Sequence, residues 1–202
     1  MYSIKLGCEK MYCGENAVQA LKTLGGKRAF IVMSGDILIE VGSYKKVADV
    51  LAEAGFTYEA YTEVEPEPSF QTILKGAERM KEFEPDWVIG FGGGSAMDAA
   101  KAMWVFYENT DYTTLEETMP PNTIRHLREK ARVCCIPTSA GTGSEATRAA
   151  LIKDTMQKKK YSVRDMNGRL VPDVAILGPF IYRINAKELN GSIGNGCFDS
   201  RY

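Results

Sequence analysis

The chain has 202 residues, 45% of them hydrophobic and 25% charged, which is enough to bury the core of one ordinary domain. A net charge of −1 argues against a surface that tracks nucleic-acid phosphates, and no apolar run approaches the length of a membrane span. The first residues also lack a signal-peptide pattern. We therefore expect a soluble, cytoplasmic protein that binds neither nucleic acid nor membrane.

The first half of the chain alternates short apolar runs with segments of helical period. This alternation predicts a parallel sheet covered by helices. The helix at 70–83 has Ser69 as its expected N-cap, and the helix at 44–54 stops at Gly55. The predicted strands are 28–33, 56–61 and 86–91, and the predicted helices are 44–54, 70–83 and 96–107.

The second half begins with an acidic, proline-marked loop at 108–121. We expect a polar helix at 124–130 after it, with the single histidine, His126, on its surface rather than in a metal site.

A buried strand at 133–136 contains Cys134 and Cys135. The five cysteines have no C-x-x-C spacing, which favours reduced thiols. Further predicted strands are 149–153, 159–163 and 174–177.

Three glycines and a serine, Gly92 to Ser95, join the third predicted strand to the helix at 96–107. Glycines let backbone amides approach a phosphate closely, and a helix N-terminus supplies partial positive charge. The spacing is not the G-x-G-x-x-G of the standard dinucleotide fingerprint. Two interpretations stay open, a phosphate-binding loop and a tight turn whose glycines only relieve backbone strain.

A second loop of small residues, 137–145, follows the strand at 133–136. It offers the hydroxyls of Thr138, Ser139, Thr142 and Ser144, which suit phosphate, ribose or a carboxamide. Loops at the carboxyl ends of parallel strands are where α/β folds bind ligands. The alternative is a solvated surface turn.

The two loops carry a family resemblance. The runs GGGSAMDAAK at 92–101 and PTSAGTGSEAT at 137–147, with PDVAIL at 172–177, resemble the iron-containing alcohol dehydrogenases. The resemblance covers about residues 27–179, and it is specific because two long motifs occur in order. It implies an α/β fold with a Rossmann-like parallel sheet and helices on both faces, followed in the family by a helical metal-binding domain.

The resemblance also implies a cofactor, NAD or NADP, and an alcohol or aldehyde substrate. Carried over by position, the first loop would hold the pyrophosphate and neighbouring groups, and the second would contact the phosphate and nicotinamide side. Leu177 would line the same cleft. The implied cofactor-binding residues are Gly93, Gly94, Ser95, Asp98, Thr138, Ser139, Thr142 and Leu177.

The choice between NAD and NADP depends on the end of the first predicted strand. An acidic side chain there would bind the ribose 2′-hydroxyl of NAD and repel the 2′-phosphate of NADP. This chain has Ser34 and Gly35 at that place, which permits NADP, while Asp36 lies close enough to keep NAD possible.

The pattern of the family breaks towards the C-terminus. The iron or zinc ligands that the family places on a helix fall at Gly196 and Ser200, and neither residue type is a usual ligand. Cys197 and Asp199 have no third partner. We therefore expect an NAD(P)-binding domain at 1–179, an aberrant start of a truncated metal-binding domain at 180–202, no metal site, and weak or no dehydrogenase activity of this chain alone.

Two other interpretations remain at this point. The chain could be a non-catalytic nucleotide-binding remnant, or a relative of the glycerol dehydrogenases and dehydroquinate synthases, which share the two-domain plan. The run AGTGSE at 140–145 favours the alcohol dehydrogenases. An apolar face left without its second domain favours self-association, so we expect a homo-oligomer.

Overall fold

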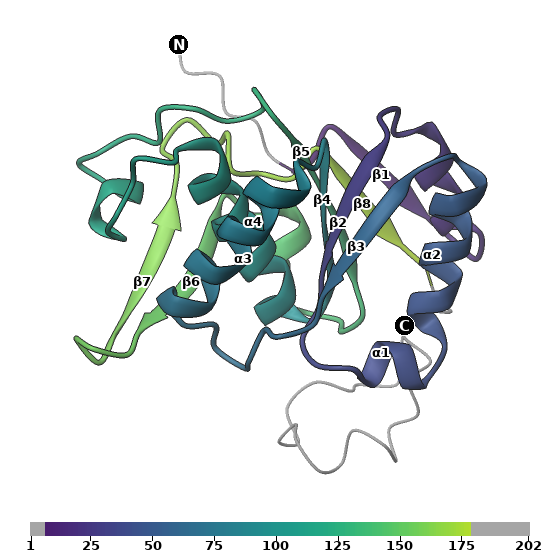
Figure 1. Ribbon diagram of the computed structural model, residues 1–202, viewed down its shortest axis with the longest axis horizontal. Helices are drawn as coiled ribbons and strands as arrows, with labels where there is room; N and C mark the ends of the chain where they lie inside the picture. Colours follow the sequence, from purple (N-terminus) through teal and green to yellow (C-terminus); the bar gives the residue numbers. More distant parts are fainter. Residues whose placement is uncertain (1–6, 179–202) are drawn as a thin grey trace.

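The computed structural model describes residues 7–178 (Figure 1). Six parallel strands form one sheet in the order β1-β8-β5-β4-β2-β3, and β6 and β7 form a separate antiparallel hairpin. This confirms the predicted α/β class. The strands are β1 (Lys10–Cys13), β2 (Arg28–Val32), β3 (Thr57–Tyr61), β4 (Trp87–Gly92), β5 (Arg132–Pro137), β6 (Ala149–Asp154), β7 (Lys159–Arg164) and β8 (Val174–Leu177).

Helices cover both faces of the sheet. Figure 1 shows α3, α4 and the β6–β7 hairpin on one side, and α1 and α2 on the other. The α-helices are α1 (Ile37–Glu40), α2 (Ser43–Glu53), α3 (Phe70–Phe83) and α4 (Gly94–Glu108). Short 3-10 turns are η1 (Ala17–Thr23), η2 (Glu116–Thr118) and η3 (Ser144–Ala146).

Alternate side chains of the central strands β2, β4 and β5 enter two separate cores, one under α3 and α4 and one under α2 and η1. In β2, Phe30 and Val32 pack with α3 and α4, whereas Ala29 and Ile31 pack with α2 and η1. This division follows from the two-residue period of a strand. Because both faces are covered, these central strands read in the sequence as continuous apolar runs rather than as alternating ones.

Helix α4 is the central helix of the core that it forms with α3 and one face of the sheet. Twelve of its residues are buried, including Trp104, and small residues bring its first turns close to β4. A Cβ on Gly90 would lie 3.0 Å from the Cα of Met97 and 3.0 Å from the Cβ of Ala100. The glycine in β4 therefore sets how closely the helix approaches the sheet.

The chain order places a switch point between β2 and β4. From β2 the chain moves outwards to β3 through α1 and α2, then returns through α3 to β4 on the other side of β2. The chain after β2 leads to β3, whereas the chain after β4 leads through α4 to β5 in the opposite direction along the sheet. The loops that follow β2 and β4 therefore diverge at the carboxyl edge. Ligands of open α/β sheets bind in the crevice at such a point.

The prediction of a polar helix at 124–130 is wrong, because this segment has no helical hydrogen bonding. Its backbone is instead bound by side chains at the end of α4. The Asn109 side chain accepts from the His126 N–H at 2.9 Å and donates to the His126 carbonyl at 2.8 Å. The Glu108 carboxylate accepts from the N–H groups of Lys130 and Ala131.

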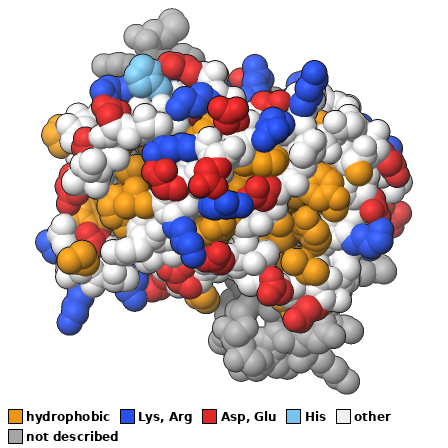
Figure 2. Space-filling view, viewed as in Figure 1, with side chains coloured by type: hydrophobic (Ala, Val, Ile, Leu, Met, Phe, Trp, Pro, Cys, Tyr) orange, Lys and Arg blue, Asp and Glu red, His pale blue; other side chains and the backbone are white. Residues whose placement is uncertain are grey.

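Charged residues of both signs are interspersed across the middle of the face seen in Figure 2. Many form ion pairs, for example Arg79 with Glu59 at 2.7 Å and with Glu82 at 2.6 Å. No helix within residues 7–178 is long and apolar enough to cross a membrane.

Candidate functional site

The junction between β4 and α4 is built from glycines. Gly92 has a φ of +150°, a conformation that suits glycine, and Gly93 is the N-cap of α4 with no side-chain cap. The helix begins directly at Gly94. Its first N–H groups therefore face the space beyond the sheet without a capping side chain from Gly93, which is the arrangement that binds anions at helix N-termini.

The loop after β5 lies against this junction. Gly92 and Pro137 are register partners, so both loops leave the sheet at the same level, and the Thr138 N–H donates to the Gly92 carbonyl at 2.9 Å. A Cβ on Gly93 would lie 3.3 Å from the Ser139 Oγ. The backbone of one loop and the hydroxyls of the other thus share one narrow space that a side chain at position 93 would fill.

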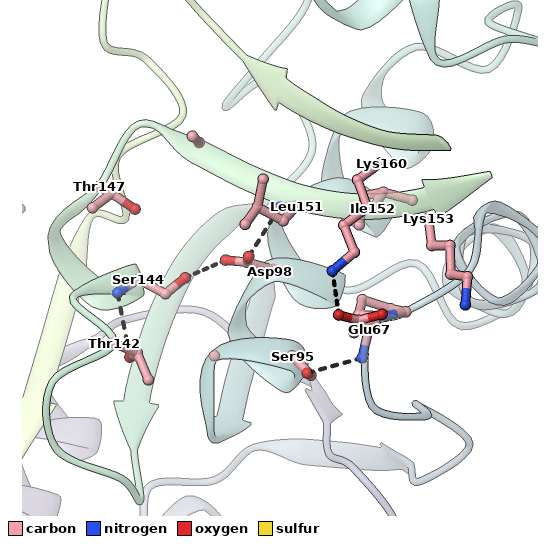
Figure 3. Close-up of a pocket in the computed structure, with 13 residues that line it drawn as sticks. Glu67, Ser95, Asp98, Thr142, Ser144, Thr147, Leu151, Ile152, Lys153 and Lys160 are labelled. Atoms are coloured by element: carbon pink, nitrogen blue, oxygen red, sulfur yellow. Dashed lines mark hydrogen bonds and ion pairs between the residues drawn. The ribbon is translucent and has the colours of Figure 1, made fainter. Parts of the chain in front are cut away.

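A cavity of about 460 Å³, here named the α4 pocket, opens beside the N-terminus of α4 (Figure 3). It lies between α4, the loop after β3, the loop after β5 and the β6–β7 hairpin. Glu67 and Lys160 form an ion pair across its edge, and the Glu67 N–H donates to the Ser95 Oγ at 3.3 Å. The lining residues are Glu67, Pro68, Gly94, Ser95, Asp98, Thr142, Ser144, Thr147, Ala149, Leu151, Ile152, Lys153 and Lys160.

Four of the residues proposed from the sequence line this pocket, namely Gly94, Ser95, Asp98 and Thr142. Gly93, Thr138 and Ser139 lie next to it at the junction of the two loops. Leu177 ends β8, next to β5, and its carbonyl accepts from the Gly14 N–H at 3.0 Å. All of these residues lie at the carboxyl edge of the sheet.

Ser34 lies just beyond β2, on the other side of the switch point, and bridges to Glu63. Its Oγ is buried and has no hydrogen-bond partner. The Tyr61 hydroxyl, at the end of β3, is also buried without a partner. Burial, together with the nearby carboxylates of Glu63 and Glu65, raises the pKa of Tyr61 to about 12.

The Asp98 side chain is bound to the protein on both oxygens. One oxygen accepts from the Ser144 hydroxyl, and the other accepts from the Leu151 N–H at 2.9 Å (Figure 3). The family motif implies that Asp98 lies near the pyrophosphate, but it does not indicate these contacts within the protein.

Lys101 is not among the residues expected from the sequence, yet it is fully buried one turn further along α4. Its Nζ donates to the carbonyl of Ser144 at 3.0 Å and to that of Ala149. The available signal was a lysine inside a run of small and apolar helical residues, since lysines are almost never fully buried unless paired.

Within residues 7–178 no group of three or more His, Cys, Asp or Glu side chains could hold a metal ion. His126 is exposed and pairs with Glu129. Burial raises the pKa of the Cys135 thiol to about 12, which keeps it protonated rather than metal-binding. The positions discussed for a metal, at 196–200, lie outside the described residues.

Comparisons with known proteins agree with this geometry. The family model of the iron-containing alcohol dehydrogenases matches residues 8–179. The chain is 42% identical over 167 residues to the NADPH-dependent butanol dehydrogenase of Clostridium saccharobutylicum, and this match covers 83% of the chain and 42% of that protein. It is 37% identical over 179 residues to aldehyde-alcohol dehydrogenase 2 of Entamoeba histolytica, covering 84% of the chain and 20% of that protein.

A solved structure gives the same result. An iron-containing alcohol dehydrogenase from Thermotoga maritima superimposes with a TM-score of 0.80 at 31% identity, over 95% of this chain and 52% of that one. The chain thus spans about half or less of the length of these relatives. The match of both sequence and fold over nearly all the described residues means that the chain belongs to the iron-containing alcohol dehydrogenase family.

Proposed function

We propose that this chain is the nucleotide-binding part of an NAD(P)-dependent alcohol dehydrogenase, and that the cofactor lies across the carboxyl edge of the sheet at the β2–β4 switch point. The observation that carries the proposal is the glycine cradle. Gly93 leaves the N-terminus of α4 without a side-chain cap, and a Cβ there would lie 3.3 Å from the Ser139 hydroxyl. This space suits a phosphate group, which needs close contact with the backbone and several hydrogen-bond donors.

The pyrophosphate would take the N–H groups at the start of α4, where the helix dipole favours negative charge. The Ser95 hydroxyl faces the same pocket and already accepts from the Glu67 N–H, so its own proton is available to a phosphate oxygen. The hydroxyls of Thr138, Ser139 and Thr142 would contact the cofactor from the opposite loop.

The adenosine ribose would lie near Ser34, whose buried Oγ has no partner in the protein. We favour NADP over NAD, because Ser34 and Gly35 place no carboxylate where the 2′-phosphate would lie. The NADPH-dependent name of the butanol dehydrogenase relative supports this preference. Asp36 is exposed at the start of α1 and leaves room for NAD as the weaker ligand.

The bound nucleotide supplies a nicotinamide ring that exchanges a hydride with an alcohol or aldehyde. This chain's residues bind and orient that nucleotide, and the hydroxyl-rich loop after β5 shapes the wall of the α4 pocket. The family name implies iron, but residues 7–178 do not provide a ligand set for it. We therefore assign no chemical step in this chain to a metal.

Fluorescence titration of the purified chain with NADPH and NADH, in metal-free buffer, tests the proposal. We expect saturable binding of both and tighter binding of NADPH. Adenosine 2′,5′-bisphosphate should compete better than 5′-AMP, since it carries the distinguishing phosphate. A chain that circular dichroism shows to be folded, but that binds neither nucleotide, would contradict the proposal.

A further inference from the structure

Two side chains of α4 hold the segment between β5 and β6. Asp98 and Lys101 are three residues apart and therefore lie on the same face of the helix. Their charged groups approach each other, with 3.5 Å between the Lys101 Nζ and the Asp98 Oδ1. Both contact the same stretch of chain, residues 144–151, which we name the β5–β6 segment.

Lys101 binds acceptors of this segment. Its Nζ donates to the Ser144 carbonyl at 3.0 Å, to the Ala149 carbonyl, and to Thr147, whose Oγ1 and carbonyl lie 3.4 and 3.5 Å away. An ammonium group has three protons, and three residues of one segment receive them. The side chain is fully buried, so water does not replace these contacts.

Asp98 binds donors of the same segment. Its carboxylate accepts from the Ser144 hydroxyl at one end and from the Leu151 N–H at the other. Figure 3 shows the carboxylate pointing between these two partners, away from Ser95. A cation for the carbonyls and an anion for the N–H and O–H groups together satisfy both kinds of polar group in the segment.

The contacts matter because much of this segment has no strand partner. Residues 144–148 precede the β6–β7 hairpin, and Ser144 is buried, so its carbonyl would lack a partner without the Lys101 ammonium group. Ser144, Thr147, Ala149 and Leu151 all line the α4 pocket. Whatever holds the segment also sets the shape of that wall of the pocket.

We propose that Asp98 and Lys101 act as a pair of positioning residues that fix the β5–β6 segment against α4, and that Asp98 serves the site in this way instead of as a direct ligand of the nucleotide. The consequence for nucleotide binding rests on the proposed function. The fixing of the segment does not, because it concerns contacts within the protein.

Hydrogen exchange of the nucleotide-free chain tests the pair directly. Lys101→Met keeps an unbranched side chain of similar length, one heavy atom shorter, but removes the donors. We expect amide exchange within residues 144–151 to become at least about tenfold faster, while exchange in β2 and β4 stays unchanged. Lys45→Met is the control. Lys45 pairs with Asp49 on the same helix, α2, which lies on the opposite face of the sheet from α4.

The same variants are then titrated with NADPH. We expect the Kd to rise about tenfold in Lys101→Met and in Asp98→Asn, and the emission of bound NADPH to move towards that of the free nucleotide. In the double variant the losses should not add, because both side chains act on one segment. Asp98→Asn keeps the shape of the side chain and serves as the test if Lys101→Met does not fold.

The outcomes separate the two proposals. Unchanged exchange at 144–151 in both single variants overturns the positioning pair. Weakened NADPH binding by Asp98→Asn with unchanged exchange also overturns it, because Asp98 would then be a direct ligand. Faster exchange at 144–151 in a chain that binds no nucleotide supports the pair and contradicts only the proposed function.

Discussion

Two neighbouring junctions at the carboxyl edge of the sheet, β3–α3 and β4–α4, lead from a strand into a long helix in opposite ways. At the start of α3 the Ser69 Oγ accepts from the Thr72 N–H at 3.2 Å, and Glu65 accepts from the Ser69 N–H at 2.9 Å. At the start of α4 a glycine is the N-cap and no side chain takes its place. One junction is closed by its own side chains and the other is left open.

The capped start of α3 belongs to the scaffold of the fold, whereas the uncapped start of α4 belongs to the candidate site. Burial alone would raise the pKa of Glu65, but hydrogen bonds from Ser69 and Thr72 hold it below its ordinary value, so the carboxylate stays charged at the start of α3. A negative charge there stabilises the helix. At α4 no side chain of the N-cap makes this interaction, and under the proposed function a phosphate of the nucleotide would take its place.

Gly93→Val should produce the largest change in nucleotide affinity, because it closes the junction of α4 that is otherwise open. The added side chain would fill the space next to Ser139 and block the approach of a phosphate to α4. We expect the Kd for NADPH to rise roughly thirtyfold, about 2 kcal/mol, with little change in thermal stability, because the φ of −76° at this position is accessible to any residue. Calorimetric titration and thermal melts measure both quantities.

An equal loss of stability and affinity would contradict this prediction, since it would mean that position 93 matters for the fold. Gly25→Ala is not a suitable control, because Gly25 has a φ of +65°. Ser69→Ala, at the capped junction of α3, is the better counterpart.

Ser69→Ala should have the reverse effect. Loss of the N-cap should cost about 1 kcal/mol of unfolding free energy, lowering the melting temperature by roughly 2–4 °C. The Kd for NADPH should stay within about twofold, because the Ser69 side chain serves α3 and not the cradle. Urea unfolding gives the first quantity and fluorescence titration the second. A clear change in Kd would show that the two junctions are coupled.

Tyr61→Phe should have the smallest effect and one confined to alkaline pH. The Tyr61 pKa of about 12 lies above its ordinary value of 10, so the folded chain keeps the proton that the unfolded chain releases. The stability that depends on this group is complete below pH 10 and is lost as the pH rises through 12. Urea unfolding at pH 8 to 11.5 should show a flatter decline in Tyr61→Phe.

At pH 8 the two chains should be nearly equal in stability, because the Tyr61 hydroxyl has no partner to lose. A marked destabilisation of Tyr61→Phe at pH 8 would reveal a contact of this hydroxyl and refute the expectation.

The regular part of the fold could be predicted from the sequence. Strong apolar runs located β2 to β5 and β8, and the helix predicted at 70–83 coincides with α3. Strand β1 could not be found, because Lys10–Cys13 carries no apolar pattern and depends on its pairing with β8. The helix expected at 124–130 failed because Glu108 and Asn109, distant in the sequence, bind its backbone.

The site was only partly predictable for the same reason. Motifs located the two loops, since glycines and hydroxyls are local signals. The contacts of Asp98 and Lys101 with the β5–β6 segment join residues more than 40 positions apart, for which one sequence offers no spacing rule. Whether the residues proposed from the motifs touch the nucleotide stays a prediction.

The pairing of β1 with β8 also bears on synthesis of the chain. Lys10 lies opposite Val174, so β1 leaves the ribosome about 160 residues before β8 and must wait for it before joining the sheet. Until then β5 lacks its neighbour on that side, and the half-built sheet exposes an unpaired edge. We therefore expect newly made chains to be open to chaperone binding until residue 177 has emerged, because β2, β3, β4 and β5 can pair before then but β5 still lacks β8.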